Sequence, residues 1–335
     1  MQLARPNYVA WLIDKADFPY EKAIEARLEF IAGYGVLAPS QHNTQPWLIS
    51  VEGATLTIRP DNTKKLVVGD PLDQGLYIAL GACVENILQA ATGFGLVAEV
   101  IFRPEAIRLM FSEVKAKSAD EQVLVAITSR HSDKFPYSEK PVSESNHQTL
   151  NGVCEKGVEH VIVTDDFRRN KIVALHAKAT ADVAADTAFV GELTNWLRPN
   201  DTKAYDGMPG FVTGLSRLQA RVGGLLLAKK PEMFKLMVKK DVMLMKATPA
   251  VVVWAVRDTS ASSMFACGRH IERLWLKATE LGLALHPMHS ICAMEATRKE
   301  LAILCDIDSS PVFLARLGHH ADTGLRTPRK GATWI

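Results

Sequence analysis

The chain contains little of what marks membrane, nucleic-acid-binding or secreted proteins. No apolar run reaches the roughly 18 residues that a membrane-spanning helix needs. The net charge is only +2 over 335 residues, so bulk electrostatics favour neither nucleic acid nor a membrane surface. The N-terminus lacks the charged-then-apolar pattern of a secretion signal. We therefore expect a cytoplasmic protein whose partners are small molecules, with no nucleic acid and no membrane among them.

Cysteine is also scarce, and the familiar catalytic motifs are missing. The 5 cysteines are scattered, and no pair has the spacing of a metal site or a redox motif. There is no glycine-rich phosphate loop, no Gly-x-Ser-x-Gly elbow and no zinc spacing. The adjacent pair His319-His320 would point to opposite faces of a strand, so we expect no metal there. Reduced, mostly buried thiols fit a cytoplasmic protein.

The most distinctive stretch present is Ala38–Trp47, which reads Ala-Pro-Ser-Gln-His-Asn-Thr-Gln-Pro-Trp. An apolar segment before it predicts a helix, and an alternating segment after it predicts a strand. Two prolines, which stiffen the backbone, bracket a cluster of small polar side chains. Such a loop can hold hydrogen-bonding groups against a planar ligand with polar edges, although the pattern also fits an ordinary helix-to-strand connection.

A second motif reads Arg130-His131-Ser132-Asp133-Lys134-Phe135. Together the two motifs resemble those of the FMN-dependent nitroreductase superfamily, namely a Pro-Ser-x-x-Asn-x-Gln-Pro-Trp loop and an Arg-x-Ser-x-Arg/Lys signature. In ordinary members of that superfamily the signature precedes the loop. Here it follows the loop by about ninety residues, which indicates an unusual chain architecture.

The chain also contains an internal repeat, because residues 79–96 match residues 266–283 at a constant offset of 187. Both segments predict a helix that ends at a glycine. Small residues near the start of each segment would allow the two helices to approach closely, although two unrelated amphipathic helices remain an alternative. The shared residues are Ala79, Gly81, Glu85, Ala91, Thr92, Gly95 and Leu96, which recur as Ala266, Gly268, Glu272, Ala278, Thr279, Gly282 and Leu283.

The resemblance explains the repeat as a fused duplication. Its implied fold is α+β, with two tandem nitroreductase-like copies, 1–128 and 129–335, forming a pseudo-dimer within one chain. In the superfamily each flavin site takes the signature from one subunit and the loop from the other. The first copy keeps the loop and the second keeps the signature, so we expect one complete site. The implied assembly is a monomeric pseudo-dimer or a weak homodimer.

The segment 187–248 has no counterpart in the first copy. It contains Trp196, Tyr205 and Phe211 around a glycine-rich turn, followed by a lysine-rich stretch. A long insertion in a compact domain is usually functional, so we interpret the segment as a lid over the site. It also fits a helical pair that pads the core and, less well, a membrane-surface helix.

The resemblance implies that the chain holds one FMN and takes electrons from NAD(P)H. Lys134 takes the position that meets the pyrimidine edge of the flavin, and the tail arginines fall where the superfamily has basic residues, although such a tail also fits a merely solvated surface. The implied cofactor contacts are Arg130, His131, Ser132, Lys134, Pro39, Ser40, Gln41, Asn43, Pro287, Met288, Arg326 and Arg329.

The function that follows is hydride transfer from NAD(P)H through the flavin to a small electron-poor acceptor, such as a nitroaromatic or a quinone. No proton-donating side chain is required, so no catalytic residue is assigned. Two alternatives remain open: a non-catalytic protein that sequesters flavin beneath the lid, and a specialised flavin-dependent dehydrogenase.

Overall fold

The computed structural model describes the backbone of residues 3–113, 121–229, 234–288 and 290–332, and the side chains of these residues except 224–229 and 234–236. Antiparallel sheets and helices are combined without steady strand–helix–strand alternation, so the predicted α+β class is confirmed. None of the described helices is long and apolar enough to cross a membrane.

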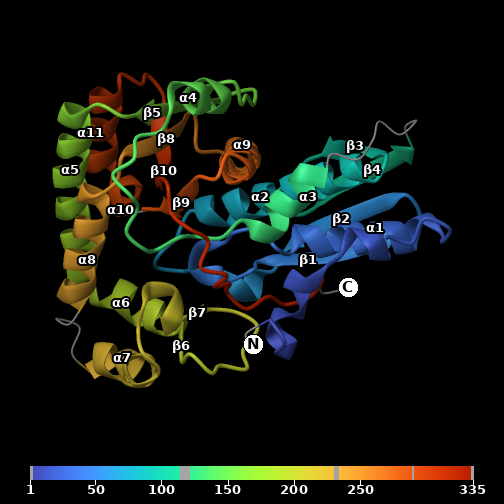
Figure 1. Cartoon of the computed structure of the whole chain (residues 1–335), viewed down its shortest axis with the longest axis horizontal. Helices are drawn as coiled ribbons and strands as arrows, with labels where there is room; N and C mark the ends of the chain where they lie inside the picture. Colours follow the sequence, from blue (N-terminus) through green and yellow to red (C-terminus); the bar gives the residue numbers. More distant parts are fainter. Residues whose placement is uncertain (1–2, 114–120, 230–233, 289, 333–335) are drawn as a thin grey trace.

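Two four-stranded antiparallel sheets form the two lobes of the molecule (Figure 1). Their strand orders are β1-β2-β4-β3 and β5-β8-β10-β9, so both run first, second, fourth, third along the chain. The strands are β1 (Trp47–Glu52), β2 (Thr55–Pro60), β3 (Leu96–Ile101), β4 (Ile107–Glu113), β5 (Val158–Val163), β8 (Ala250–Val256), β9 (Ala284–Pro287) and β10 (Ser310–Gly318). A short parallel ribbon pairs β6 (Leu197–Arg198) with β7 (Met208–Pro209).

The sequence of β8, Ala-Val-Val-Val-Trp-Ala-Val, shows why the second sheet is central to its lobe. All its residues are buried, and β-branched side chains suit such a strand. Because alternate residues point to opposite faces, Val252 and Trp254 join one core while Val251 and Val253 join another. Helices therefore cover both faces of this sheet.

Two 20-residue helices, α2 (Gln74–Gly93) and α9 (Ala261–Glu280), cross between the sheets. They start 187 residues apart and also end 187 residues apart. A Cβ on Gly81 would lie 2.2 Å from the Phe265 carbonyl oxygen, and a Cβ on Gly268 would lie 2.1 Å from that of Ile78. The contact is reciprocal, since Ile78 and Phe265 are themselves one repeat apart, and the predicted close approach is confirmed.

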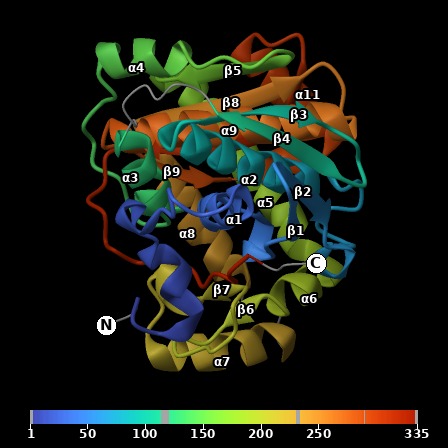
Figure 2. The ribbon, with the colours of Figure 1, turned by 90° about the vertical axis from the view of Figure 1, so that its right-hand side faces the viewer.

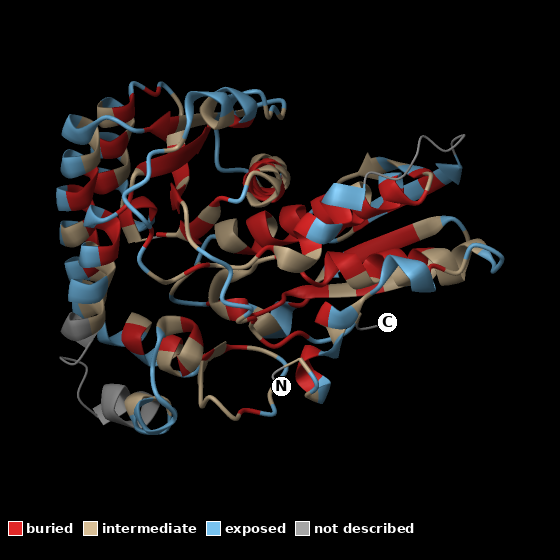
Figure 3. Cartoon of the chain, viewed as in Figure 1, coloured by how far each residue is buried: buried red, intermediate tan, exposed pale blue. Residues whose placement is uncertain are grey.

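The remaining helices surround this centre, and the outward faces of α5 and α8 are exposed (Figure 3). They are α1 (Ile24–Gly35), α3 (Glu121–Ser129), α4 (Glu144–Asn151), α5 (Asp166–Ala185), α6 (Thr187–Thr194), α7 (Arg217–Lys229), α8 (Phe234–Lys246), α10 (Ser290–Ala293) and α11 (Glu295–Cys305). Short 3₁₀ helices span Pro6–Leu12, Lys15–Asp17, Gln41–Asn43, Asn62–Lys64 and Gly210–Thr213.

The two sheets differ in the connection between their first and second strands. A tight turn at Gly53 joins β1 to β2, whereas residues 164–249 separate β5 from β8. The segment without a counterpart thus starts before α5, earlier than the predicted 187. Figure 2 shows its α6, α7, β6 and β7 gathered below the two sheets. The division into two copies stays a prediction, which the matching strand orders and the reciprocal glycines support.

Candidate functional site

The loop Pro39–Trp47 lies between α1 and β1 in a strained backbone. His42, Asn43 and Gln45 have φ angles of 51°, 60° and 53°, a region that non-glycine residues seldom adopt. Such conformations cost on the order of 1 kcal/mol each and persist only where surrounding contacts enforce them. One such contact is internal, because the Ser40 hydroxyl accepts the Gln45 N–H at 2.9 Å.

Side chains of the loop bind two remote segments of the chain. The Asn43 amide donates to the carbonyl oxygens of Gly207 (3.1 Å) and Pro328 (3.0 Å). The Gln45 amide donates to Tyr205 O (2.7 Å), and its oxygen accepts the N–H of residue 330 (2.8 Å). Asn43 and Gln45 are both buried. The loop therefore joins the insertion to the C-terminal tail.

The other predicted loop contacts lie nearby but bind differently. The Gln41 amide donates to Gly69 O at 3.4 Å, towards the segment that precedes α2. Pro39 is half-buried where the chain enters the loop.

The signature segment starts where α3 ends, and its first residue reaches the loop. Arg130 is 1% exposed, donates to the Leu37 carbonyl oxygen and places Nε 2.9 Å from Glu272 Oε1. Its guanidinium also lies 4.9 Å from the Trp275 ring centre. The structure thus brings both predicted halves of the site together, with Arg130 fully enclosed between them.

Residues after Arg130 run beside the second sheet. Ser132 forms a parallel bridge with Leu285 of β9, and the Asp133 N–H donates to the Leu285 carbonyl oxygen. This pairing places the signature next to the predicted ring-packing residues, Pro287 and Met288. The Met288 side chain, however, is buried in the core and its N–H donates to Leu314 O at 2.8 Å. Residue 289 lies outside the described part of the chain.

Lys134 has an unusual environment for an ammonium group. Its only hydrogen bond among the described residues is to Met208 Sδ of β7, at 3.5 Å, and a thioether is a weak acceptor. Burial lowers the pKa of Lys134, and the charge of Asp241 on α8 opposes that shift. The site therefore presents a donor whose strong acceptor is missing.

Two arginines of the tail are buried, which overturns the alternative of a solvated tail. Arg329 donates to Asn43 Oδ1 and to the carbonyl oxygens of Leu37 and Ala38 at 3.3 Å each. Arg326 is 7% exposed and lies 5.7 Å from the ring centre of Trp11. The guanidinium of Arg329 lies 4.8 Å from the same ring.

These groups concentrate positive charge in a buried region. Burial lowers the pKa of Arg130, as does Arg326, while Glu272 opposes the shift. Burial and then Arg130 hold the pKa of Arg329 well below its usual range. Burial and then Arg326 lower the pKa of His131. Burial also raises the pKa of Glu272 to about 7, so even the central carboxylate resists ionisation. Converging buried cations favour an anionic ligand.

Sequence reasoning missed several residues that build this region. Trp11 donates from its indole N–H to Thr327 O at 2.9 Å and packs against both tail arginines. Glu272 had a visible signal, since it repeats Glu85, but its partner Arg130 did not follow from the sequence. Asp133 and Asp322 gave no signal beyond their nearness to the predicted residues.

Comparisons with known proteins find relatives that match most of the chain. The chain is 25% identical over 317 residues, covering 88% of each chain, to "Probable NAD(P)H nitroreductase PigM" of a Serratia species. It is 24% identical over 301 residues, covering 84% of this chain and 85% of the other, to the similarly named acg protein of Mycobacterium tuberculosis. No family model matches the chain. A solved FMN-dependent nitroreductase, NfnB of Mycobacterium smegmatis in complex with NADPH, has a TM-score of 0.42 and 15% identity, covering 63% of this chain and 95% of its own.

Over most of its length the chain is therefore similar to long, single-chain proteins that are named NAD(P)H nitroreductases.

Proposed function

We propose that the protein is an FMN-binding oxidoreductase of the nitroreductase type that takes electrons from NAD(P)H. The observation that carries the proposal is the pairing of Lys134, a partly buried ammonium without a strong acceptor among the described residues, with a cluster of three buried arginines. FMN offers carbonyl oxygens at its pyrimidine edge and a phosphate at the other end. The ammonium group and the arginine cluster therefore match the two polar ends of this cofactor.

The residues present divide the binding role between them. Arg130, Arg326 and Arg329 would hold the phosphate, and Arg326 is the most available because its carboxylate partner, Asp322, has a side chain that is 47% exposed. Ser132 and His131 lie in the same segment. The loop residues Pro39, Ser40, Gln41 and Asn43, with Pro287 and Met288, would border the ribityl chain and the ring.

Bound flavin supplies hydride transfer, and the protein supplies the charge and the enclosure. Lys134 would neutralise negative charge that develops at the pyrimidine edge on reduction, which stabilises the reduced state. Residues 205–208 contact both the loop and Lys134, so they would exclude water from the same region. The acceptor we favour is a small electron-poor molecule such as a nitroaromatic or a quinone.

We further propose a single flavin site per chain. In support, the loop and the signature each occur once, and Arg130 of the signature donates to the carbonyl oxygen of Leu37, just before the loop. Flavin released by heat and measured against protein should approach a ratio of one. A ratio near two would contradict the single-site arrangement.

The contacts of residues 205–208 with the loop and Lys134 also favour a second candidate function, a protein that sequesters flavin without catalysis. One experiment separates this alternative from the enzyme. The protein should absorb near ~450 nm when it carries flavin, because this band belongs to the cofactor. NADPH or NADH should bleach the band, and a nitroaromatic or a quinone should restore it within repeated turnovers. Flavin that binds but is not reduced would support storage, and failure to bind FMN would refute both.

A further inference from the structure

Asp133, a position that the Arg-x-Ser-x-Lys pattern leaves unspecified, is buried and fully hydrogen-bonded. It is 1% exposed, and its N–H donates to Leu285 O at 3.0 Å. Its carbonyl oxygen accepts the Tyr137 hydroxyl at 3.1 Å. One carboxylate oxygen accepts the Phe135 N–H at 3.0 Å, and the other accepts Nδ1 of His320. The carboxylate therefore has a fixed place and a fixed orientation.

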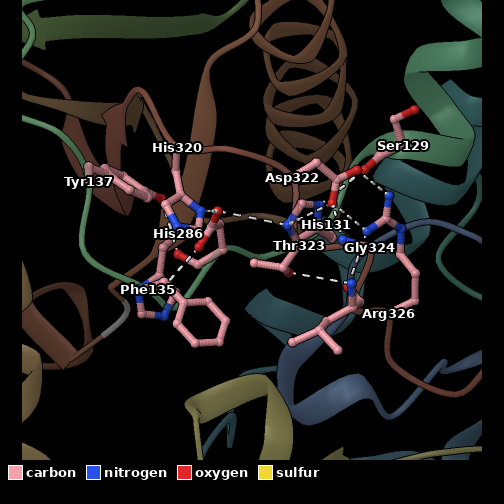
Figure 4. Close-up of polar contacts among 12 residues, drawn as sticks. Ser129, His131, Phe135, Tyr137, His286, His320, Asp322, Thr323, Gly324 and Arg326 are labelled. Carbon is pink, nitrogen blue, oxygen red and sulfur yellow. Dashed lines mark hydrogen bonds and ion pairs between the residues drawn. The ribbon is translucent and has the colours of Figure 1, made fainter. Parts of the chain in front are cut away.

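From Asp133, polar side chains continue along the tail. His131 Nε2 lies 3.8 Å from Asp133 Oδ2 and 3.8 Å from Asp322 Oδ1, between the two carboxylates and hydrogen-bonded to neither. Both oxygens of Asp322 bind Arg326, at 2.8 and 3.0 Å. Figure 4 shows His131 beside Asp322 and Arg326, with His320 on the other side. We call these five residues, His320, Asp133, His131, Asp322 and Arg326, the latch.

The latch matters because no helix or strand fixes this part of the chain, and its backbone–backbone hydrogen bonds lie near its ends, from Ser138 N–H to His319 O and from Arg329 N–H to Asn7 O, at 2.9 Å each. Residues 319–332 contain no helix or strand, yet Arg326 and Arg329 are buried. His320 also stacks on Phe135, with ring centres 5.9 Å apart and planes at 13°. Between those ends, side-chain contacts such as those of His320 and Arg326 hold the segment on its course towards Trp11 and the loop.

We propose that Asp133, acting through His320 and His131, is a positioning residue that holds the tail so that Arg326 and Arg329 face the anionic end of the cofactor. The inference rests on the proposed function for the identity of that ligand. It assigns to Asp133 a role distinct from those of its neighbours Ser132 and Lys134, because Asp133 would act on the cofactor only through the tail.

The first test measures FMN affinity of the apoprotein by flavin fluorescence quenching. Asp133→Asn keeps the size of the side chain and an acceptor for the Phe135 N–H but removes the charge. We expect its Kd for FMN to rise at least ten-fold. The matched control is Asp165→Asn, which removes the charge that caps α5 and should leave the affinity within two-fold of wild type. Equal affinities of Asp133→Asn and wild type would overturn the inference.

A double-variant cycle separates positioning from general destabilisation. In an Arg326→Ala background, Asp133→Asn should weaken FMN binding by less than three-fold, since one of the two groups that it positions is already gone. A full ten-fold loss in both backgrounds would show that Asp133 acts independently of the tail, and the proposal would be wrong.

A third measurement needs no flavin. Trypsin can cut the apoprotein after Arg326 and Arg329 only when the tail leaves its buried course. Asp133→Asn and His320→Ala should speed this cleavage at least ten-fold, whereas Asp165→Asn should not. Unchanged cleavage in Asp133→Asn would refute the latch even if the protein binds FMN. If the wild type failed to bind FMN, the proposed function would fall, and the cleavage rates would still decide whether Asp133 holds the tail.

Discussion

Glu85 and Glu272 occupy the same position in the two crossing helices, but their surroundings are opposite. Glu85 is bound by two arginines of α9: Arg273 at 2.7 and 2.9 Å, and Arg269 at 3.1 Å. Glu155 adds a further carboxylate 3.0 Å from Arg273. Two carboxylates thus balance two arginines. This half of the helix crossing is electrostatically complete and has no need of a ligand.

Around Glu272 the balance is different. Its one direct ion pair is with Arg130, and the position next to it on the opposing helix holds the neutral Asn86, where the other half has Arg273. Arg326 and Arg329 then add positive charge, and the carboxylate that pairs with Arg326, Asp322, has a side chain that is 47% exposed. The difference teaches that internal ion pairs balance the charges of one half, while the other half has an excess of positive charge that an anion can balance.

The largest expected effect comes from breaking the helix crossing that both halves share. Gly81→Ala would place a Cβ 2.2 Å from a carbonyl oxygen of α9, so the two backbones must separate. We expect unfolding to become easier by about 4 kcal/mol or more, at the upper end of overpacking costs. Chemical denaturation measures it. Gly93→Ala in the same helix, where the nearest atom is 3.5 Å away, should change stability by under about 1 kcal/mol.

The next effect distinguishes the two halves directly. Arg130→Ala leaves Glu272 buried without its direct partner and should cost about 3 kcal/mol of stability, together with loss of flavin retention. Arg273→Ala should cost about 1 kcal/mol, since Arg269 still binds Glu85, and should leave flavin bound. Denaturation and the flavin-to-protein ratio after gel filtration measure both. Equal loss of flavin in the two variants would contradict the comparison.

Acid should lower the stability of the half of the crossing around Glu85, through the histidines His270 and His160. His270 Nδ1 accepts the Trp254 indole N–H at 3.0 Å. Protonation of Nδ1 would remove this acceptor and leave two N–H donors facing each other. Burial, and then the charge of His270, lower the pKa of His160 to about 4. Because the pKa of His160 is lower in the folded than in the unfolded protein, its contribution to stability is fully present above about pH 6.5. That contribution is lost as the pH falls through about 4.

For His160 the loss should amount to about 2 kcal/mol after allowance for its partial exposure. Denaturation at pH 7 and at pH 4 would detect it, and His160→Gln should reduce the loss of stability between these two pH values by about 2 kcal/mol. A variant with the same pH dependence as wild type would exclude His160 as the source.

The smallest effect concerns access to Lys134. Met208→Ala removes the side chain that contacts the ammonium group and should leave stability within about 1 kcal/mol, because Met208 is only partly buried. If residues 205–208 restrict access, oxygen should reoxidise the reduced flavin a few-fold faster in this variant. Stopped-flow absorbance measures the rate. Reoxidation at the wild-type rate would place the barrier elsewhere.

Much of the fold could be predicted because its signals are local. The helix predicted before the loop and the strand predicted after it are α1 and β1, and the helices predicted in the two repeat segments are α2 and α9. Gly95 and Gly282, predicted to end the repeated helices, have φ angles of 75° and 69°, which glycine adopts without strain.

The details of the site could not be predicted, because they depend on contacts between distant segments. Arg130 fits a phosphate ligand in the sequence, yet whether it meets Glu272 depends on how α9 packs against α3. The tail gave no periodicity, so its path beneath Trp11 had no local signal. Met208 was visible only as part of a turn, and its contact with Lys134 follows from the placement of the whole insertion.

The crossing of α2 and α9 has a consequence for how the protein responds to dilution. Two separate subunits would dissociate as their concentration falls, but here both helices belong to one chain, so their effective concentration is set by the connection between them. The association is first-order and does not weaken in dilute solution. In a symmetric dimer a substitution alters both sides of the contact at once. In this chain Gly81 and Gly268 can each be substituted alone, so one side of the helix contact can change in sequence while the other side keeps its residues.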